Sequence, residues 1–422
     1  MVTLSQRQLQ RVKVIEKVAE GHLSVAQAAE LLHLSTRQVK RLKKGYDPDN
    51  AVWVYHGNRG KPPTHRIPDA TRRQVVALAK AKYAGFNDSH LQEKLASQED
   101  LRLSRPTVRR ILRQAGLASP QKRRSSRYRS RRERREQEGA MLQTDGSRHD
   151  WLEGRGPHLT LLGFIDDATG KVPVARFQEE AEDAVGYLRI LRLQVEQVGV
   201  PLSIYHDRHS IFQRNDDHWS VAEQLQGEQS PTQVGRALQE LGIASISARS
   251  PQAKGRIERL WRTFQDRLPS ELRLAGAATL AQSNQVLQRF LVEYNAQFAR
   301  PAKQVPSAYR KLERRLDLDY IFSLRYERKV NPDHTVTAPG LLLQLPSLPQ
   351  GRGFAGKKVE ICQQPNGAWR VYLDRRLLHV QPAAANAPAP RVLKIQRHRT
   401  AHKKKTPRIY SYSGHEAKGP AV

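Results

Sequence analysis

Apolar residues near the start of the chain recur every three or four positions, with polar residues between them. The apolar positions of this first segment are Leu9, Val12, Ile15 and Val18. Because this spacing places them on one face of an α-helix, the segment is predicted to be helical. Two further helices are predicted to begin after Ser24 and Ser35, since each serine stands three residues before a glutamine, the spacing of a capping box.

The last two of these helices are predicted to be joined by a tight turn at His33 and Leu34. Val39 and Leu42 would face inward. The basic residues on the outer side are Arg37, Lys40, Arg41 and Lys44. Residues 1–46 are therefore predicted to form a helix-turn-helix DNA-binding domain whose last helix enters the major groove. A plain three-helix packing module is the alternative.

A second helical module is predicted after a Gly/Pro-rich linker at residues 47–66. Residues 70–84, 89–96 and 103–116 have helical patterns, and Ser104 suits the N-cap of the last segment. The outward-facing basic residues of that segment are Arg105, Arg109, Arg110 and Arg113. Residues 67–117 are thus predicted to be a second helix-turn-helix-like DNA-binding domain.

The run at residues 118–140 is strongly basic and has too few apolar residues to bury a core. It is predicted to be a linker that contacts DNA through Arg123, Arg124 and Arg127.

From Met141 the pattern changes to short apolar runs that alternate with helical segments. Strands are predicted at 141–147, 202–207 and 243–249, and a hairpin at 158–177 with its turn at 168–170. Helices are predicted at 184–198 and 232–242 and from 250 onward, and Trp151 and Trp261 are predicted to be core residues. The order of three strands, helix, strand, helix, strand, helix predicts an RNase H-like mixed-sheet core at residues 141–300.

The last part of the chain is rich in strand patterns. Strand candidates lie at 322–330, 334–345, 357–364 and 369–380, and Asn366-Gly367 is a hairpin-turn signal. Residues 317–381 are predicted to form a small β-barrel, followed by a basic tail at 391–422. The predicted fold class is multidomain α/β: all-α helix-turn-helix modules, an RNase H-like catalytic core, then the barrel.

The net charge of the chain predicts a binding partner. The 422 residues include 72 Lys or Arg and 41 Asp or Glu, a formal net charge of +31. Such a charge attracts polyanions, so double-stranded DNA is the predicted partner. No apolar run is long enough for a membrane span, and the start lacks the apolar region of a signal peptide. A single cysteine, Cys362, excludes an intrachain disulfide framework, and a cytoplasmic protein is expected.

Three carboxylates are the candidate catalytic residues. Asp145 ends the first predicted strand, Asp207 ends the fourth, and Glu258 lies on the helix after the fifth. In the RNase H-like order the first and fourth strands are neighbours and the last helix crosses beside them, so the three side chains can converge. Converging carboxylates repel unless cations separate them, which predicts two Mg²⁺ or Mn²⁺ ions per site.

Other charged residues near these positions have competing explanations. Glu258 could instead be a solvated carboxylate that pairs with Lys254 and Arg262 along the helix. Asp166 and Asp167 are adjacent, so they more simply satisfy a hairpin turn. The basic residues beside Glu258 that are predicted to contact DNA are Lys254, Arg256 and Arg259.

Five segments resemble a known family. The segments QTDGSRHDWLEGRGP, FIDDATG, YHDRHSIF, QVGRALQELGI and SPQAKGRIERLWRTFQDRLPSELR look like those of the integrase-core (DDE) transposases of bacterial insertion sequences, in particular the ISNCY group. The resemblance implies a metal-binding triad of Asp145, Asp207 and Glu258. It also implies that Lys254 and Arg256 grip DNA.

The function implied is that of a DNA transposase. Such a protein binds the terminal inverted repeats of its element and catalyses metal-dependent 3′-end cleavage and strand transfer into target DNA. It would act as a homo-oligomer on DNA, in the bacterial cytoplasm and associated with the nucleoid. The alternatives are a DNA-binding regulator with an inactive RNase H-like core and a nuclease of another purpose. The insertion at 210–232 could be a lid, a dimer contact or a target-DNA clamp.

Overall fold

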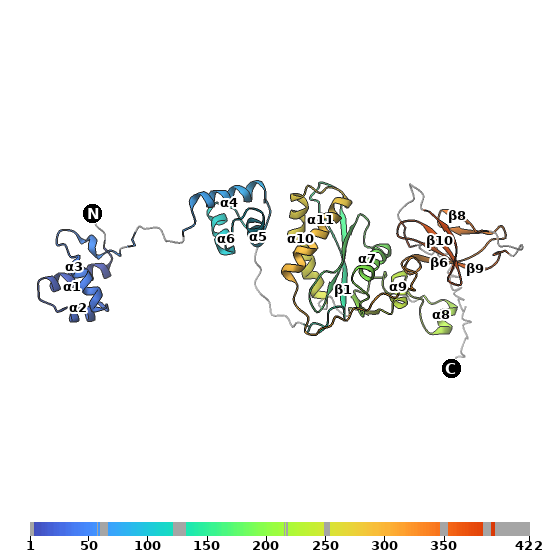
Figure 1. Cartoon of the computed structure of the whole chain (residues 1–422), viewed down its shortest axis with the longest axis horizontal. Coiled ribbons are helices and arrows are strands. Elements are labelled where there is room, and N and C mark those ends of the chain that lie inside the picture. Colours follow the sequence, from blue (N-terminus) through green and yellow to red (C-terminus); the bar gives the residue numbers. More distant parts are fainter. Residues whose placement is uncertain are drawn as a thin grey trace, which may run out of the picture. The chain divides into compact units, whose positions relative to one another are not determined.

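The computed structural model describes most of the chain (Figure 1). The described residues are 4–56, 58–59, 66–120, 132–214, 216, 218–248, 254–346, 353–382 and 390–392. Two compact units are present, residues 1–78 with 110–115 and residues 79–109 with 116–422. Arg123, Arg124 and Arg127 of the predicted basic linker lie outside the described residues, as does nearly all of the predicted basic tail.

The first helical module has the three predicted helices, α1 (Gln6–Ala19), α2 (Val25–Leu32) and α3 (Thr36–Lys44). Ser24 forms a complete capping box with Gln27, whereas Ser35 only accepts a hydrogen bond from the backbone N–H of Gln38. His33 ends α2 in the left-handed conformation, with φ of 51°. The helices pack around a small core of Ile15, Val18, Ala28, Ala29 and Val39.

The outer side of α3 is basic, as predicted. Val39 is completely buried and Leu42 is half-buried. The exposed basic residues are Arg37, Lys40, Arg41 and Lys44. A short 3₁₀ helix, η1 (Ala51–Val54), follows, and its Trp53 packs edge-on against Tyr46.

The next three helices also lie where the pattern predicts them. They are α4 (Asp69–Ala81), α5 (Asp88–Gln98) and α6 (Arg105–Gln114). The Asn87 side chain caps α5 by accepting from the backbone N–H groups of Ser89 and His90. On α6, Arg105, Arg109 and Arg110 are exposed and Arg113 is half-buried.

The middle of the chain is a five-stranded sheet in the order β3-β2-β1-β4-β5. Its strands are β1 (Leu142–His149), β2 (Leu159–Asp166), β3 (Ala175–Gln178), β4 (Ser203–His206) and β5 (Ala244–Ser247). The first three form an antiparallel meander, and β4 and β5 run parallel to β1. This is the predicted mixed sheet, in which the first and fourth strands are neighbours.

Helices cover both faces of this sheet. They are α7 (Ala184–Gln197), α9 (Gln233–Glu240), α10 (Gly255–Leu274) and α11 (Leu280–Phe298), while α8 (Val221–Gln226) lies in the insertion at 210–232. One core cluster joins the sheet to α7 and α9, and a second joins it to α10 and α11. Figure 1 shows β1 between α7 and α10. Because both faces are covered, all eight residues of β2 are buried. Trp151 and Trp261 belong to the second cluster, which confirms them as core residues.

Two predicted details differ in the structure. The first strand continues to His149 instead of ending at residue 147, because Ser147, Arg148 and His149 all pair with β2. The insertion at 210–232 contains a helix that the sequence analysis omits, α8, which Ser220 and Glu223 cap reciprocally.

The C-terminal part is antiparallel β structure. After α12 (Leu318–Ile321) come β6 (Leu324–Lys329), β7 (Thr335–Ala338), β8 (Leu341–Gln344), β9 (Lys358–Gln363), β10 (Trp369–Leu373) and β11 (Arg376–Gln381). They form a four-stranded sheet, β11-β10-β9-β6, and the β7-β8 hairpin, which share one apolar core. The predicted small barrel is thus two sheets around one core. Among the described helices, none has the length and apolar character of a membrane span.

Candidate active site

Asp145 and Asp207 meet at one end of the parallel pair β1-β4. The register pairs Leu142 with Ile204 and Gln143 with Tyr205. Asp145 and Asp207 each lie two residues further along in sequence from Gln143 and Tyr205, so the sheet brings these two side chains to the same place. The convergence of the first and fourth strands, expected from the order of elements, is therefore present.

Asp207 is held by its neighbours on β4 and in the following turn. The His206 ring stacks on Phe212 with ring centroids 4.2 Å apart, and its Nε2 lies 2.7 Å from the Ser245 hydroxyl. Burial lowers the pKa of His206, so the ring is neutral near pH 7. The Asp207 carboxylate also accepts a hydrogen bond from the backbone N–H of His209 at 3.1 Å.

Lys254 lies between the two aspartates. Its Nζ is 2.9 Å from Oδ1 of Asp145 and 3.4 Å from Oδ2 of Asp207. Burial by itself lowers the pKa of Lys254, but the charges of the two aspartates outweigh burial and the pKa is raised. Lys254 is therefore charged at neutral pH, and one ammonium serves two carboxylates.

Burial has the opposite effect on Asp145. It raises the pKa of this carboxyl, and the nearby charge of Asp207 adds to the rise, while Lys254 opposes it. The lysine thus compensates only part of the cost of keeping two carboxylates together.

Glu258 lies on α10, one turn after Lys254, and is exposed. In the described part of the chain it makes no recorded ion pair, and no three His, Cys, Asp or Glu side chains there are grouped closely enough to hold a metal ion. The structure therefore brings Asp145 and Asp207 together but leaves Glu258 outside the pair. Its part in a metal-binding triad stays a prediction.

Asp166 and Asp167 occupy separate environments. Asp166 accepts from the backbone N–H of Thr169 at 2.7 Å and from its hydroxyl at 2.8 Å, which is the hairpin-turn role expected for it. Asp167 is fully buried and binds Arg256 Nη1 at 2.6 Å and Gln143 Nε2 at 2.7 Å. Arg132 and the backbone N–H of Arg135 also donate to it.

Arg256 is consequently engaged within the protein, with only 12% of its side chain exposed. This contact fixes the first turn of α10 against the end of β2. Arg259, three residues after Arg256, is exposed. The predicted contacts of Lys254, Arg256 and Arg259 with DNA remain predictions.

Glu182 is a fourth carboxylate at this site that the sequence analysis omits. A Cβ added to Gly146 would lie 2.6 Å from Oε2 of Glu182, so the glycine after Asp145 leaves room for it. The hydroxyl of Tyr187 donates to its Oε1. Burial raises the pKa of Glu182, and the negative charges of Asp145 and Asp207 add to the rise. A glycine inside a strand, directly after a candidate ligand, was the available signal of a close approach.

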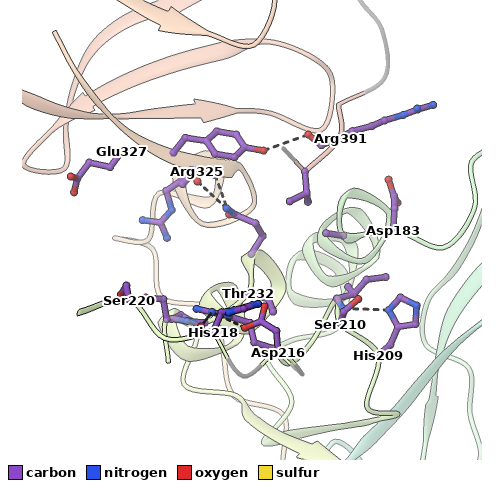
Figure 2. A pocket seen from close by; sticks show the side chains of 18 of the residues that line it. Asp183, His209, Ser210, Asp216, His218, Ser220, Thr232, Arg325, Glu327 and Arg391 are labelled. Carbon is purple, nitrogen blue, oxygen red and sulfur yellow. Dashed lines mark hydrogen bonds and ion pairs between the residues drawn. The ribbon is translucent and has the colours of Figure 1, made fainter. Parts of the chain in front are cut away.

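A groove with a volume of about 1790 Å³ is present, and Glu182 and His209 are among its lining residues. Figure 2 shows His209 and Ser210 from the segment after β4, Ser220 from the insertion, and Arg325 and Glu327 from β6 around it. Four arginines line the groove, Arg214, Arg325, Arg328 and Arg391. Six acidic residues also line it, Glu180, Glu182, Asp183, Asp216, Glu223 and Glu327. The lining is therefore not positively charged.

The paired aspartates suit a hard divalent cation. Two carboxylates, one on β1 and one directly after β4, face one cationic atom, the Lys254 ammonium. Carboxylate oxygens are the ligands that Mg²⁺ and Mn²⁺ prefer. The residues present thus fit a divalent ion.

A helix-turn-helix domain together with a mixed sheet that carries paired aspartates defines a DNA-binding protein with an integrase-type core. Residues 10–48 match the model of a helix-turn-helix domain family. A protein of Sinorhizobium fredii named as transposase y4bF is 38% identical over 368 residues, which cover 87% of this chain and 79% of that protein. The transposase for insertion sequence IS1202 of Streptococcus pneumoniae is 29% identical over 361 residues, covering 76% and 75%.

Similar solved structures include a simian T-cell lymphotropic virus intasome, with a TM-score of 0.32 and 14% identity over 73% of this chain and 96% of that one. The catalytic core domain of BIV integrase has a TM-score of 0.25 and 17% identity over 41% and 90%. The extent and identity of the match to the Sinorhizobium protein establish the family. The chain belongs to the insertion-sequence transposases.

Proposed function

We propose that this chain binds the terminal inverted repeats of its own element, cleaves DNA to free a 3′-OH, and joins that end to target DNA. The observation that carries the proposal is the pair of aspartates on neighbouring parallel strands, which share a single cation in a protein of a transposase family. In the first step water attacks phosphorus and the 3′-OH leaves. In the second step that hydroxyl attacks a target phosphodiester, so one such bond replaces another and no cofactor is oxidised or reduced.

Asp145, Asp207 and Glu258 are the residues that would hold Mg²⁺ or Mn²⁺, two ions per site. Bound divalent ions would neutralise charge on the transferred phosphate and lower the pKa of the attacking hydroxyl. The chain supplies positioning, which is most of what phosphoryl transfer requires. His206 and the backbone of His209 orient Asp207, and the Arg256–Asp167 contact fixes the first turn of the helix that carries Glu258.

DNA binding is assigned to the basic helices of the N-terminal modules. Arg37, Lys40, Arg41 and Lys44 on α3 form one exposed basic side. We do not assign duplex binding to the groove lined by Glu182 and His209, because the carboxylates among its described lining residues outnumber the arginines and would repel phosphates. Pairing of two element ends requires at least two copies of the chain. We expect the protein to act on the bacterial nucleoid.

A cleavage assay on DNA from the ends of the element tests the proposal. The wild-type chain should nick at the 3′ ends in Mg²⁺ or Mn²⁺, and Glu258→Gln should bind the same DNA without nicking it. Equal nicking by both proteins would show that Glu258 is not part of the triad. DNA binding with no nicking by the wild type would favour a regulator. Joining of a pre-cut 3′ end to a second duplex distinguishes a transposase from a nuclease.

A further inference from the structure

Among the described residues, the charges at the paired aspartates are unbalanced. Lys254 is the only cation among the described residues with a recorded ion pair to Asp145 or Asp207, and it serves both. The side chains of Asp145 and Asp207 remain 21% and 43% exposed, whereas that of Lys254 is 9% exposed. The lysine is therefore enclosed, and the carboxylates it bridges are still accessible to an ion from solvent.

The position of Lys254 does not favour the helix that follows it. It is the N-cap residue of α10 and makes no side-chain capping hydrogen bond. The N-terminus of a helix carries partial positive charge, so a lysine there is unfavourable for the helix itself. The contact with the two aspartates, rather than helix stability, accounts for where its ammonium lies.

A divalent ion that bridges the two aspartates competes with this ammonium for their oxygens. Lys254 Nζ contacts Oδ1 of Asp145 and Oδ2 of Asp207, and Mg²⁺ binds carboxylate oxygens at about 2.0–2.1 Å, closer than any ammonium contact. Loading the site therefore requires Lys254 to move away from Asp145 and Asp207.

We infer that Lys254 is an internal counter-ion that takes the place of the divalent ion in the unloaded site and is displaced when that ion binds. The displaced ammonium needs a new anionic partner, and a DNA phosphate at the active site is one. Binding of the ion and of DNA would then favour each other. The ion frees the Lys254 ammonium to contact a phosphate, and the phosphate holds the ammonium away from the aspartates. The inference rests on the proposed metal-dependent function and gives Lys254 two successive partners.

Mn²⁺ binding to the full-length chain tests the inference without any measurement of activity. Titrations followed by the electron paramagnetic resonance of free Mn²⁺ would compare the wild type with Lys254→Met, Lys254→Arg and Arg262→Met. Lys254→Met removes the competing charge at nearly the same volume, Lys254→Arg keeps the charge, and Arg262→Met removes an exposed charge from the same helix.

We expect Lys254→Met to bind Mn²⁺ at least about fivefold more tightly than the wild type. Lys254→Arg and Arg262→Met should stay within about twofold of it. End DNA should raise the Mn²⁺ affinity of the wild type more than that of Lys254→Met. Equal or weaker binding by Lys254→Met would overturn the inference and leave the proposed function standing. No Mn²⁺ binding by any of these proteins, with or without DNA, would overturn both.

Displacement itself can be followed by chemical labelling. Ca²⁺, which has the same preference for carboxylate oxygens, should increase acylation of Lys254 by an amine-reactive ester, read by mass spectrometry. Lys171, which pairs with Glu138 at 2.8 Å away from the aspartates, is the internal reference and should be unchanged. Protection of Lys254 that does not change at saturating Ca²⁺ would contradict the inference, even if the Lys254→Met variant binds Mn²⁺ tightly.

Discussion

Two acidic centres lie within the same core and differ in how many donors they receive. Asp167 is fully buried and accepts from Arg256, Arg132, Gln143 and the backbone of Arg135. Asp145 and Asp207 are partly exposed and share one ammonium, that of Lys254. In the part of the chain that the structure describes, the first centre has several donors for one carboxylate, and the second has two carboxylates for one cation.

This difference separates a structural acid from a functional one. A buried charge is tolerated when its hydrogen bonds are complete, so the Asp167 centre can stabilise the fold without binding anything else. A pair of carboxylates with too little positive charge remains able to bind a further cation. The number of donors, more than burial alone, indicates the role of each aspartate.

Asp145→Asn gives the largest expected effect. Nicking of end DNA should fall by at least about 10²–10³-fold, because the substitution removes the negative charge of a carboxylate that would hold a metal ion at the reacting phosphate. The free energy of unfolding should change by less than about 1 kcal/mol, because the pair is partly exposed and burial already disfavours the charged form of Asp145. Cleavage kinetics and urea denaturation measure the two quantities. A large loss of stability with normal cleavage would mean that Asp145 is a structural acid and not a functional one.

Asp167→Asn should produce the opposite pattern. Removing this charge leaves Arg256 and Arg132 without their buried partner, so the free energy of unfolding should fall by about 3–5 kcal/mol. Mn²⁺ affinity measured well below the unfolding transition should fall by no more than about tenfold, because Asp167 acts on Glu258 only through the position of α10. Urea denaturation in parallel with Mn²⁺ titration tests this, and a lost Mn²⁺ site in a folded Asp167→Asn protein would assign Asp167 to the active site instead.

Glu271 is another carboxylate with more than one donor, and its contribution to stability should depend on pH. It accepts from His90 Nε2 at 2.6 Å and Lys94 Nζ at 2.8 Å, which joins α5 to α10. Burial alone would raise the pKa of Glu271, but the hydrogen bonds and charges of these two partners outweigh burial and lower it from the ordinary value of 4.5. Because the folded pKa lies below the unfolded one, the stabilisation is complete above about pH 4.5 and is lost as pH falls through the folded pKa.

The loss should amount to about 1–3 kcal/mol, the usual contribution of a hydrogen bond to a charged group. Urea denaturation from about pH 7 down to about pH 3 measures it. Glu271→Gln is the matched control, since a group that does not titrate should give a flatter profile in this range. If the free energy of unfolding of both proteins depended on pH in the same way, the ionised Glu271 would not be stabilised by its donors.

Glu182→Gln gives the smallest expected effect. The substitution keeps the side-chain volume beside Gly146 and an oxygen that can accept from Tyr187, but it removes a negative charge close to Asp145 and Asp207. Mn²⁺ affinity should fall by about tenfold, as expected of a residue next to the ligands. Glu179→Gln, an exposed change in the same loop, should leave the affinity unaltered. Similar losses in both variants would mean that only the overall charge of the loop matters.

Much of the fold was predictable because its signals are local. Ser24 and Gln27 are close in sequence, and their capping box forms as the spacing predicts. The alternation of strands and helices also placed β1 beside β4, and therefore Asp145 near Asp207. The adjacent Asp166 and Asp167 were harder. Both suited a hairpin turn, yet only Asp166 serves it, since Asp167 faces four donors from other segments.

The sequence by itself determined most of the helices and strands, the basic sides of the N-terminal modules and the pair of strands that bring Asp145 and Asp207 together. Only the tertiary structure decided which cation meets which carboxylate. Lys254 and Asp145 are 109 positions apart, and Arg256 and Asp167 are 89 apart. Local spacing carries no information on such contacts, because they depend on where α10 crosses the end of the sheet and on which way each side chain points from its first turn.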